Sequence, residues 1–338
     1  MRVIYQLNTK DLGHIAEEAR WAEAMGYDGL ASEETAHDPF LPLLLAADAT
    51  SQVTLETRVV IAFPRSPMVV AYAARDLQDF SQGRFRLGLG TQVKGHIERR
   101  FSVPWGTPGP RLREYVQSLH AIWESWQKGT KLDYQGQFYN FSLMTPFFSP
   151  GASPQPRPPV YVSAINPYNC RVAGEVCDGL ALHPLTSAKY LREVILPNLQ
   201  TGAAKSGRNP KDVKLSGGGF VVTGPDQETI EARKLAIKQQ IAFYASTRTY
   251  LPVLEVHGFH EIGHRLHEMS LTGQWERMGG LVSDEMLDAF AVVGGYDEVA
   301  WQLKDRFADL LDEVVFNMEV SSPADEAALQ RIIQVLKA

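Results

Sequence analysis

Short apolar runs rich in β-branched residues alternate with helical patterns along almost the whole chain, and this alternation limits the fold more than any other feature. The first run, Val3–Leu7, is followed by Asp11–Met25, where Ile15, Ala19 and Ala22 recur at the spacing of one helix face. The same order of strand and helix patterns continues to the C-terminus. It is typical of α/β proteins with a parallel sheet.

The predicted strands are all short, and they are Val3–Leu7, Tyr27–Ser32, Thr57–Phe63, Phe85–Leu89, Val160–Ala164, Gly179–His183, Lys214–Val222 and Glu313–Val320. The helices predicted after them are Asp11–Met25, Leu41–Ser51, a helix starting near Pro67, Arg111–Gln127, Asn166–Cys177, Ser187–Ser206, Asp226–Ala245 and Pro323–Leu336. Two insertions are expected, a small hairpin over 131–141 and a largely helical segment before the last strand.

Eight strand–helix units in 338 residues predict one domain, 1–338, folded as a (β/α)8 TIM barrel with insertions. A doubly wound open sheet is the rival architecture. It is disfavoured because the turn after the first strand, Asn8–Gly13, lacks the G-x-G-x-x-G pattern.

Composition narrows the class of partner. A net charge of -6 argues against nucleic acid or an anionic membrane as the main partner. The first residues read as a strand rather than as a signal peptide, and no stretch is apolar enough to span a bilayer. We therefore expect a cytoplasmic enzyme that acts on a small molecule. Cys170 and Cys177 lie too far apart on one predicted helix for a disulfide, so both are expected to be reduced.

Polar residues follow five successive predicted strands, where a barrel of this type carries its active site. The strand-end segments are Glu33–Asp38, Phe63–Pro67, Gly88–His96, Ser163–Pro167 and His183. Asn166 suits a helix N-cap and Pro167 the first helical position, so the next helix presents free N–H groups and its positive end. With Ser163 beside it, this turn predicts a phosphate or carboxylate site.

Two other motifs are ambiguous. Gly88-Leu89-Gly90-Thr91 has no lysine to complete a phosphate loop, and close approach of a ring or of a neighbouring strand explains the glycines equally well. His260-Glu261-Ile262-Gly263-His264 matches H-E-x-x-H, the pattern of zinc hydrolases. Apolar residues also recur here at helical spacing, which indicates an amphipathic helix with these histidines on its solvent-exposed face. No metal site is therefore expected.

The most specific motifs are Gly26-Tyr27-Asp28 with Ser32–Phe40, Phe63–Pro67, Ser81–Thr91 and Ala173–Gly179. Taken together they resemble the bacterial-luciferase-like superfamily, and most closely its branch that uses the deazaflavin coenzyme F420. The resemblance covers most of the chain. It implies a barrel with insertions that binds a flavin or deazaflavin ring in its mouth, and it suggests a homodimer.

The resemblance also implies roles for individual residues. The cofactor contacts that it implies are Glu34, the bulge at Val60, Ile61 and Ala62, the strand-end residues Gly90, Thr91 and Gln92, the phosphate turn Ser163, Ala164, Ile165 and Asn166, and the polar contact His183. In the family the bulge often contains a non-proline cis peptide and lies behind the ring.

This chain departs from similar sugar-phosphate dehydrogenases. Thr35 and Val93 stand where those enzymes carry a histidine and a glutamate, so a sugar phosphate is not the expected substrate. His37 or His96 is the predicted proton donor. The expected activity is hydride transfer between F420 and an unsaturated or carbonyl compound. A monooxygenase using reduced FMN and oxygen is the alternative, and a zinc hydrolase built on His260 and His264 is a second one.

Overall fold

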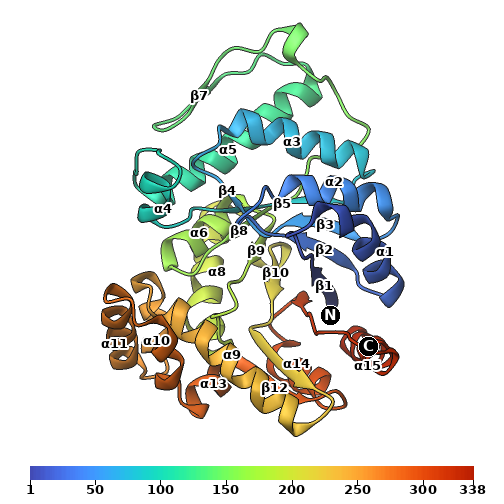
Figure 1. Cartoon of the computed structure of the whole chain (residues 1–338). Helices are drawn as coiled ribbons and strands as arrows, with labels where there is room; N and C mark the ends of the chain where they lie inside the picture. The colour runs from blue at the N-terminus through green and yellow to red at the C-terminus, as the bar shows by residue number, and fades with distance from the viewer.

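A computed structural model, which describes residues 1–338, has eight parallel strands closed into a barrel (Figure 1). In order around the barrel they are β1 (Arg2–Gln6), β2 (Gly29–Ser32), β3 (Thr54–Thr57), β5 (Phe85–Gly90), β8 (Val160–Ser163), β9 (Gly179–Ala181), β10 (Lys214–Gly217) and β13 (Glu313–Val315). Pairing of β3 with β5 closes the ring. The predicted TIM barrel is therefore confirmed.

Helices surround the barrel and follow its strands (Figure 1). They are α1 (Ile15–Met25), α2 (Phe40–Ala49), α3 (Pro67–Phe80), α4 (Lys94–Arg99), α5 (Pro108–Lys128), α6 (Pro167–Val176), α7 (Ala188–Tyr190), α8 (Leu196–Lys205), α14 (Val299–Phe307) and α15 (Pro323–Lys337). The predicted hairpin is present as β6 (Tyr134–Gln135) and β7 (Asn140–Phe141), in an arm that extends beyond α5. The chain ends meet where the Met1 amino group donates to the Leu336 carbonyl at 3.0 Å.

The third predicted strand, Thr57–Phe63, is misplaced. The barrel strand is β3, which ends at Thr57, and a short strand β4 (Val60–Ile61) pairs with β5 beyond it. A cis peptide between Arg58 and Val59 separates the two. The apolar sequence pattern predicted only β4. It missed β3, because the residues of β3 that face the barrel interior include Thr54 and Glu56, which are polar.

The seventh predicted strand, Lys214–Val222, is two strands. It breaks at Gly218 and Gly219, which both have positive φ. The first part is β10, and the second, β11 (Phe220–Gly224), pairs in parallel with β12 (Ala291–Gly295) outside the barrel. The insertion is otherwise helical as predicted, with α9 (Gln227–Ala245), α10 (Leu251–Glu255), α11 (His260–Leu271), α12 (Trp275–Met278) and α13 (Asp284–Phe290). The last barrel strand stops at Val315, five residues earlier than predicted.

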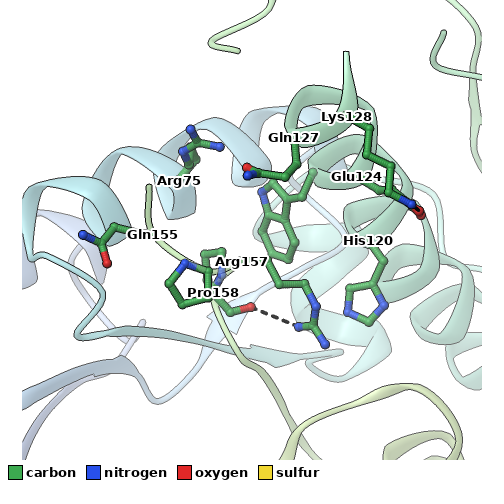
Figure 2. Close-up of a pocket in the computed structure, with 10 residues that line it drawn as sticks. Arg75, His120, Glu124, Gln127, Lys128, Gln155, Arg157 and Pro158 are labelled. Atoms are coloured by element: carbon green, nitrogen blue, oxygen red, sulfur yellow. Dashed lines mark hydrogen bonds and ion pairs between the residues drawn. The ribbon is translucent and has the colours of Figure 1, made fainter. Parts of the chain in front are cut away.

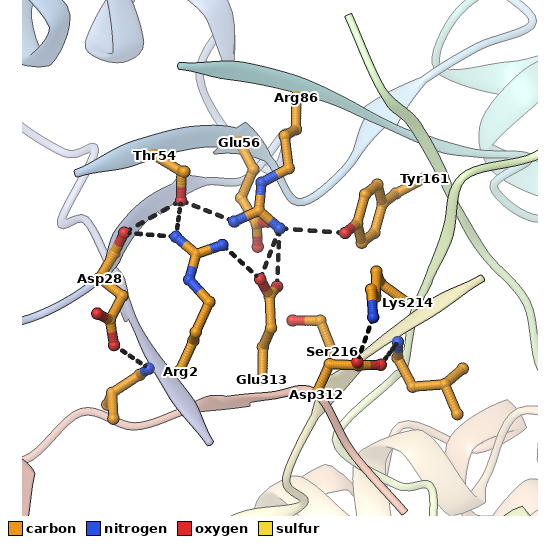
Figure 3. Close-up of polar contacts among 12 residues, drawn as sticks. Arg2, Asp28, Thr54, Glu56, Arg86, Tyr161, Lys214, Ser216, Asp312 and Glu313 are labelled. Carbon is orange, nitrogen blue, oxygen red and sulfur yellow. Dashed lines mark hydrogen bonds and ion pairs between the residues drawn. The ribbon is translucent and has the colours of Figure 1, made fainter. Parts of the chain in front are cut away.

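Charged and polar side chains at the beginnings of the barrel strands form one network of contacts (Figure 3). Glu313 accepts hydrogen bonds from Arg86 at 2.7 and 2.9 Å and from Arg2 at 3.0 Å. Arg86 also donates to Thr54 at 2.7 Å and to the Tyr161 hydroxyl at 3.2 Å. These residues begin their strands, so they close the N-terminal end of the barrel. In TIM barrels that end serves stability and the opposite end carries the chemistry.

Two further expectations concern the core and the membrane. Cys170 and Cys177 are buried free thiols, as predicted, and burial raises the pKa of Cys170 to about 12. None of the helices combines the length and the apolar character that a bilayer span requires.

Candidate active site

The C-terminal ends of the barrel strands form the mouth in which the predicted site residues were placed. Glu34 follows β2, and both of its carboxylate oxygens are bound within the protein. They accept from Arg65 at 2.8 and 2.7 Å and from the backbone N–H of Ile61 at 2.7 Å. Arg65 also reaches Asp38 at 3.1 Å. Glu34 thus fixes the backbone of β4, which is another of the predicted cofactor-binding segments.

The charge of Arg65 is stabilised by these carboxylates. Burial by itself acts to lower the pKa of Arg65, but the hydrogen bonds and negative charges of Glu34 and Asp38 outweigh it and raise this pKa. The guanidinium therefore stays protonated and holds Glu34 as a carboxylate acceptor. Arg65 belongs to the motif Phe63–Pro67, but no role was predicted for it.

Val60, Ile61 and Ala62 are buried in the wall of the mouth beside the end of β5. Val60 pairs with Leu89, Ile61 with Gly90, and the Ala62 N–H donates to the Gly90 carbonyl at 2.9 Å. The cis peptide lies at Arg58–Val59, immediately before the predicted bulge rather than within it. The structure thus brings Glu34, the bulge and Gly90 together in one wall.

The glycines of β5 have a structural explanation. A Cβ at Gly88 would lie 2.0 Å from the carbonyl oxygen of Thr57, and one at Gly90 would lie 2.7 Å from Val59. The Thr57 hydroxyl further donates to the Gly88 carbonyl at 2.9 Å and accepts from its N–H at 2.8 Å. The sequence was compatible with close approach of either a ring or a neighbouring strand. The structure shows close approach of the neighbouring chain segment at both glycines.

Thr91 and Gln92 leave β5 and turn toward α4. Gln92 has a positive φ of 55°, which is uncommon for a residue with a side chain. Its own amide oxygen accepts from the Val93 N–H at 2.9 Å and stabilises the turn. Gly90, Thr91 and Gln92 thus form a fixed rim, and their contact with a cofactor stays a prediction.

The turn after β8 has the predicted cap. The Asn166 side chain accepts from the Asn169 N–H at 2.9 Å, and Pro167 occupies the first turn of α6. The Tyr168 N–H has no backbone acceptor. Ser163 is half-buried at the end of β8, followed by buried Ala164 and half-buried Ile165, and Asn166 is exposed. An anion can therefore approach the start of α6 from the mouth.

His183 follows β9 and is held from several sides. Its Nδ1 accepts from the Leu185 N–H at 3.1 Å, and its ring packs against Tyr244 and Tyr250 with centroids 4.4 and 4.7 Å away. Burial, and then the nearby Arg58 charge, lower the pKa of His183 to about 4. The imidazole is therefore neutral near pH 7. The two tyrosines come from the insertion and were not predicted, because nothing in the local sequence points to a contact across some 60 residues.

The two predicted proton donors lie on exposed parts of neighbouring loops. His37 is in the loop after β2 and His96 is on α4. Arg100, just after α4, donates a hydrogen bond to the carbonyl of Thr35 and so ties the two loops together. Neither histidine is buried in the wall that Glu34 and β4 form. Their role in proton transfer stays a prediction.

A separate cavity of about 400 Å³ lies between α3, α5 and the segment that leads into β8 (Figure 2). Its charged side chains pair within the protein: Arg157 binds Asp178 at 2.7 and 2.9 Å, and Arg75 binds Asp79 at 2.6 Å. Burial, and then the Arg157 charge, lower the pKa of His120 to about 4. Arg157 precedes β8, so this cavity is at the opposite end of the barrel from the mouth.

His260 and His264 occupy exposed positions on α11. His267 on the same helix is bound by Ser246 and Arg248, at 2.9 and 3.1 Å. No group of three His, Cys, Asp or Glu side chains in the structure is arranged to hold a metal ion. The H-E-x-x-H pattern here is part of an amphipathic helix of the insertion.

Comparisons with known proteins identify the family. An uncharacterized protein from Mycobacterium tuberculosis is 47% identical over 320 residues, 94% of each chain. The 5,10-methylenetetrahydromethanopterin reductase of Methanolobus tindarius is 27% identical over 316 residues, 91% of this chain and 90% of the reductase.

Among solved structures, the coenzyme F420-dependent tetrahydromethanopterin reductase of Methanopyrus kandleri matches with a TM-score of 0.79 and 19% identity, over 99% of this chain and 98% of the other. That similarity shows a shared fold. The profile of the luciferase-like monooxygenase family matches residues 3–313. The chain thus belongs to the luciferase-like monooxygenase family and is a luciferase-like oxidoreductase.

Proposed function

We propose that the chain transfers hydride between coenzyme F420 and an unsaturated or carbonyl small molecule. The observation that carries this proposal is the anion-accessible start of α6 in the mouth, together with the exposed basic side chains of Lys94, Arg99 and Arg100 on and after α4. A deazaflavin carries two kinds of anionic group. Its phosphate matches the start of α6, and its acidic glutamyl tail matches the basic side chains on and after α4. Similarity to a reductase from Methanolobus favours hydride transfer over oxygenation.

The residues of the chain have separate tasks in this proposal. The Ser163 hydroxyl, the Tyr168 N–H and the positive end of α6 hold the phosphate. Glu34 and Arg65 keep the β4 wall in place, and His183 donates a hydrogen bond to the ring. When bound, the reduced deazaflavin supplies a hydride from C5. His37 or His96 supplies the proton and, being exposed, regains it from water.

A monooxygenase that uses FMN and oxygen is the alternative. Membership of the luciferase-like monooxygenase family favours it. FMN also carries a phosphate for the start of α6, but it has no glutamyl tail for the basic side chains of α4. Fluorescence titration of the purified protein with F420 and FMN separates the two, with the intrinsic tryptophans as reporters. We expect F420 to bind more tightly and its affinity to rise with tail length. Tighter FMN binding with no effect of tail length would favour the monooxygenase.

Asn166→Asp tests the phosphate site. Aspartate caps a helix as well as asparagine does, so α6 should stay folded while a negative charge is added beside the phosphate. We expect cofactor affinity to fall about 10-fold at low ionic strength and less at high salt, because salt screens the repulsion. The titration is repeated at two salt concentrations. Asn209→Asp, at a similar cap outside the mouth, is the control, and equal affinities for the two variants would contradict the assignment.

We also propose that the chain forms a homodimer through α2. Asp48 is the one charged residue of this helix, and Leu41, Leu44 and Leu45 are 52%, 43% and 38% exposed. A helix of this composition is normally buried by a partner. We expect Leu41→Glu with Leu45→Glu to convert a dimer into a monomer in analytical ultracentrifugation. Leu235→Glu, on exposed α9, should leave the mass unchanged. A wild-type monomer at micromolar concentration would refute the dimer.

A further inference from the structure

The strongest unassigned feature of the mouth is Arg58, a buried arginine at the junction between β3 and β4. Its side chain is 11% exposed and crosses the barrel lumen to the opposite strands. It donates to the Ser216 hydroxyl at 3.0 Å, to the Ser216 carbonyl at 2.9 Å and to the Leu182 carbonyl at 3.3 Å. Its backbone N–H binds the carbonyl of Ser32, at the end of β2, at 2.6 Å. Arg58 thus connects four strands, β2, β3, β9 and β10, near their C-terminal ends.

The contact with Leu182 leads directly to His183. The carbonyl that Arg58 holds belongs to the peptide between these two residues, and the Leu182 N–H donates to Ser216 at 2.8 Å. The His183 carbonyl then accepts from the Thr186 N–H at 2.8 Å across a turn with Pro184 in its second position. Proline favours this position of a β-turn. The backbone on both sides of His183 is therefore fixed.

The ring of His183 has only one tautomer compatible with these contacts. A backbone N–H can only donate, so Nδ1 must accept from Leu185 and the proton of the neutral ring must lie on Nε2. Tyr244 and Tyr250 pack against the ring and limit its rotation. His183 is thereby held as an Nε2–H hydrogen-bond donor.

We propose that Arg58 is a positioning residue, which holds the end of β9 through the Leu182 carbonyl and thereby fixes His183 as an Nε2–H donor to an oxygen acceptor in the mouth. If the function proposed above holds, this acceptor belongs to the cofactor ring. Only the identity of the acceptor rests on the proposed function. Glu56 accepts from the same guanidinium at 3.2 Å and stabilises its charge.

Electrostatics supports the same role. The groups around His183 that carry or could acquire charge are Arg58, Tyr244 and Tyr250. Burial raises the pKa of both tyrosines, and the charge of Glu33 adds to the shift of Tyr244, so both phenols are neutral near pH 7. Arg58 is the charged group that shifts the pKa of His183, because its positive charge disfavours the imidazolium.

The test is ¹⁵N NMR of the histidine side chains between pH 4 and 8, with His183→Gln to assign the signal. In the wild type we expect the Nε2–H tautomer and no titration above pH 5. In Arg58→Met we expect a mixture of tautomers, and a rise in the pKa of His183 because the nearby charge is gone. Cofactor affinity should fall about 10-fold. Unchanged tautomer and titration in Arg58→Met would overturn the inference.

Arg58→Lys covers the case in which Arg58→Met does not fold. Lysine keeps the charge but lacks the planar fork, so the titration should stay at low pH while the tautomers become mixed. A wild-type tautomer in Arg58→Lys would overturn the positioning role. Arg84→Lys is the matched control, since Arg84 also binds several carbonyls, at 2.9 to 3.0 Å, but on the outside of the mouth.

The outcome for Arg58 is distinguishable from that for the cofactor. If His183 responds as expected but the wild type binds neither F420 nor FMN, the proposed function fails and the positioning role stands. If a cofactor binds and His183 does not respond to either variant, the positioning role fails and the proposed function stands.

Discussion

Glu313→Ala is expected to lower the free energy of unfolding by about 3 kcal/mol, because the buried Arg86 guanidinium loses the carboxylate to which it is hydrogen-bonded. Glu313 and Arg86 have side chains only 3% and 8% exposed. After the substitution, the nearest carboxylate to the Arg86 guanidinium is Glu56, at 3.8 Å. Urea denaturation at pH 7, followed by tryptophan fluorescence, measures the loss.

Two controls show whether burial causes the effect. Arg86→Met with Glu313→Leu removes both charges, and we expect this double variant to recover most of the stability, since apolar replacement of a buried pair is often neutral. Asp309→Ala breaks an exposed pair with Arg192 and should cost less than about 1 kcal/mol. Equal losses for Glu313→Ala and Asp309→Ala would show that the lumen network adds no stability of its own.

Glu34→Ala is expected to weaken cofactor binding about 100-fold. The change removes the acceptor of the Ile61 N–H and the main partner of Arg65, two contacts that hold the wall next to the predicted ring site. Charged hydrogen bonds contribute about 1.5–3 kcal/mol each, and about 1.4 kcal/mol corresponds to a factor of ten in affinity. Fluorescence titration with F420 and FMN gives the dissociation constants.

Glu33→Ala is the matched control for this prediction. It removes the same charge from the adjacent position, where the side chain contacts only the Thr35 hydroxyl, at 3.5 Å. We expect its affinity to stay within about twofold of the wild type, since Glu33 holds neither the Ile61 N–H nor the Arg65 guanidinium. Glu34→Gln keeps one acceptor oxygen for Ile61 and should fall between the two. If Glu33→Ala and Glu34→Ala bind equally well, Glu34 does not organise the mouth.

Much of the fold could be predicted because strand and helix periodicities differ in a parallel barrel. The prediction failed where this contrast is absent. The lumen face of β3 carries Thr54 and Glu56, whose polarity reflects an ion network that local sequence does not reveal. Likewise β12 pairs with β11 from about 70 residues away, so neither strand alone indicates its partner.

The site shows the same division. The strand-end rule predicted which segments follow the barrel strands, and the cap at Asn166 predicted the start of α6. Both predictions depend on local sequence. Arg58 and Tyr244 were missed because their roles depend on contacts across more than 60 residues, with Ser216 and His183 respectively. The two glycines of β5 are explained only by the passage of a neighbouring strand.

The insertion that carries Tyr244 and Tyr250 has its own small sheet, β11–β12, outside the closed barrel. Arg86 and Glu313 of the lumen ion network lie outside the segment between β10 and β13, so sequence changes in that segment leave both residues in place. Any exchange of the insertion between relatives would have to keep Tyr244 and Tyr250, because both rings pack against His183 at the end of β9.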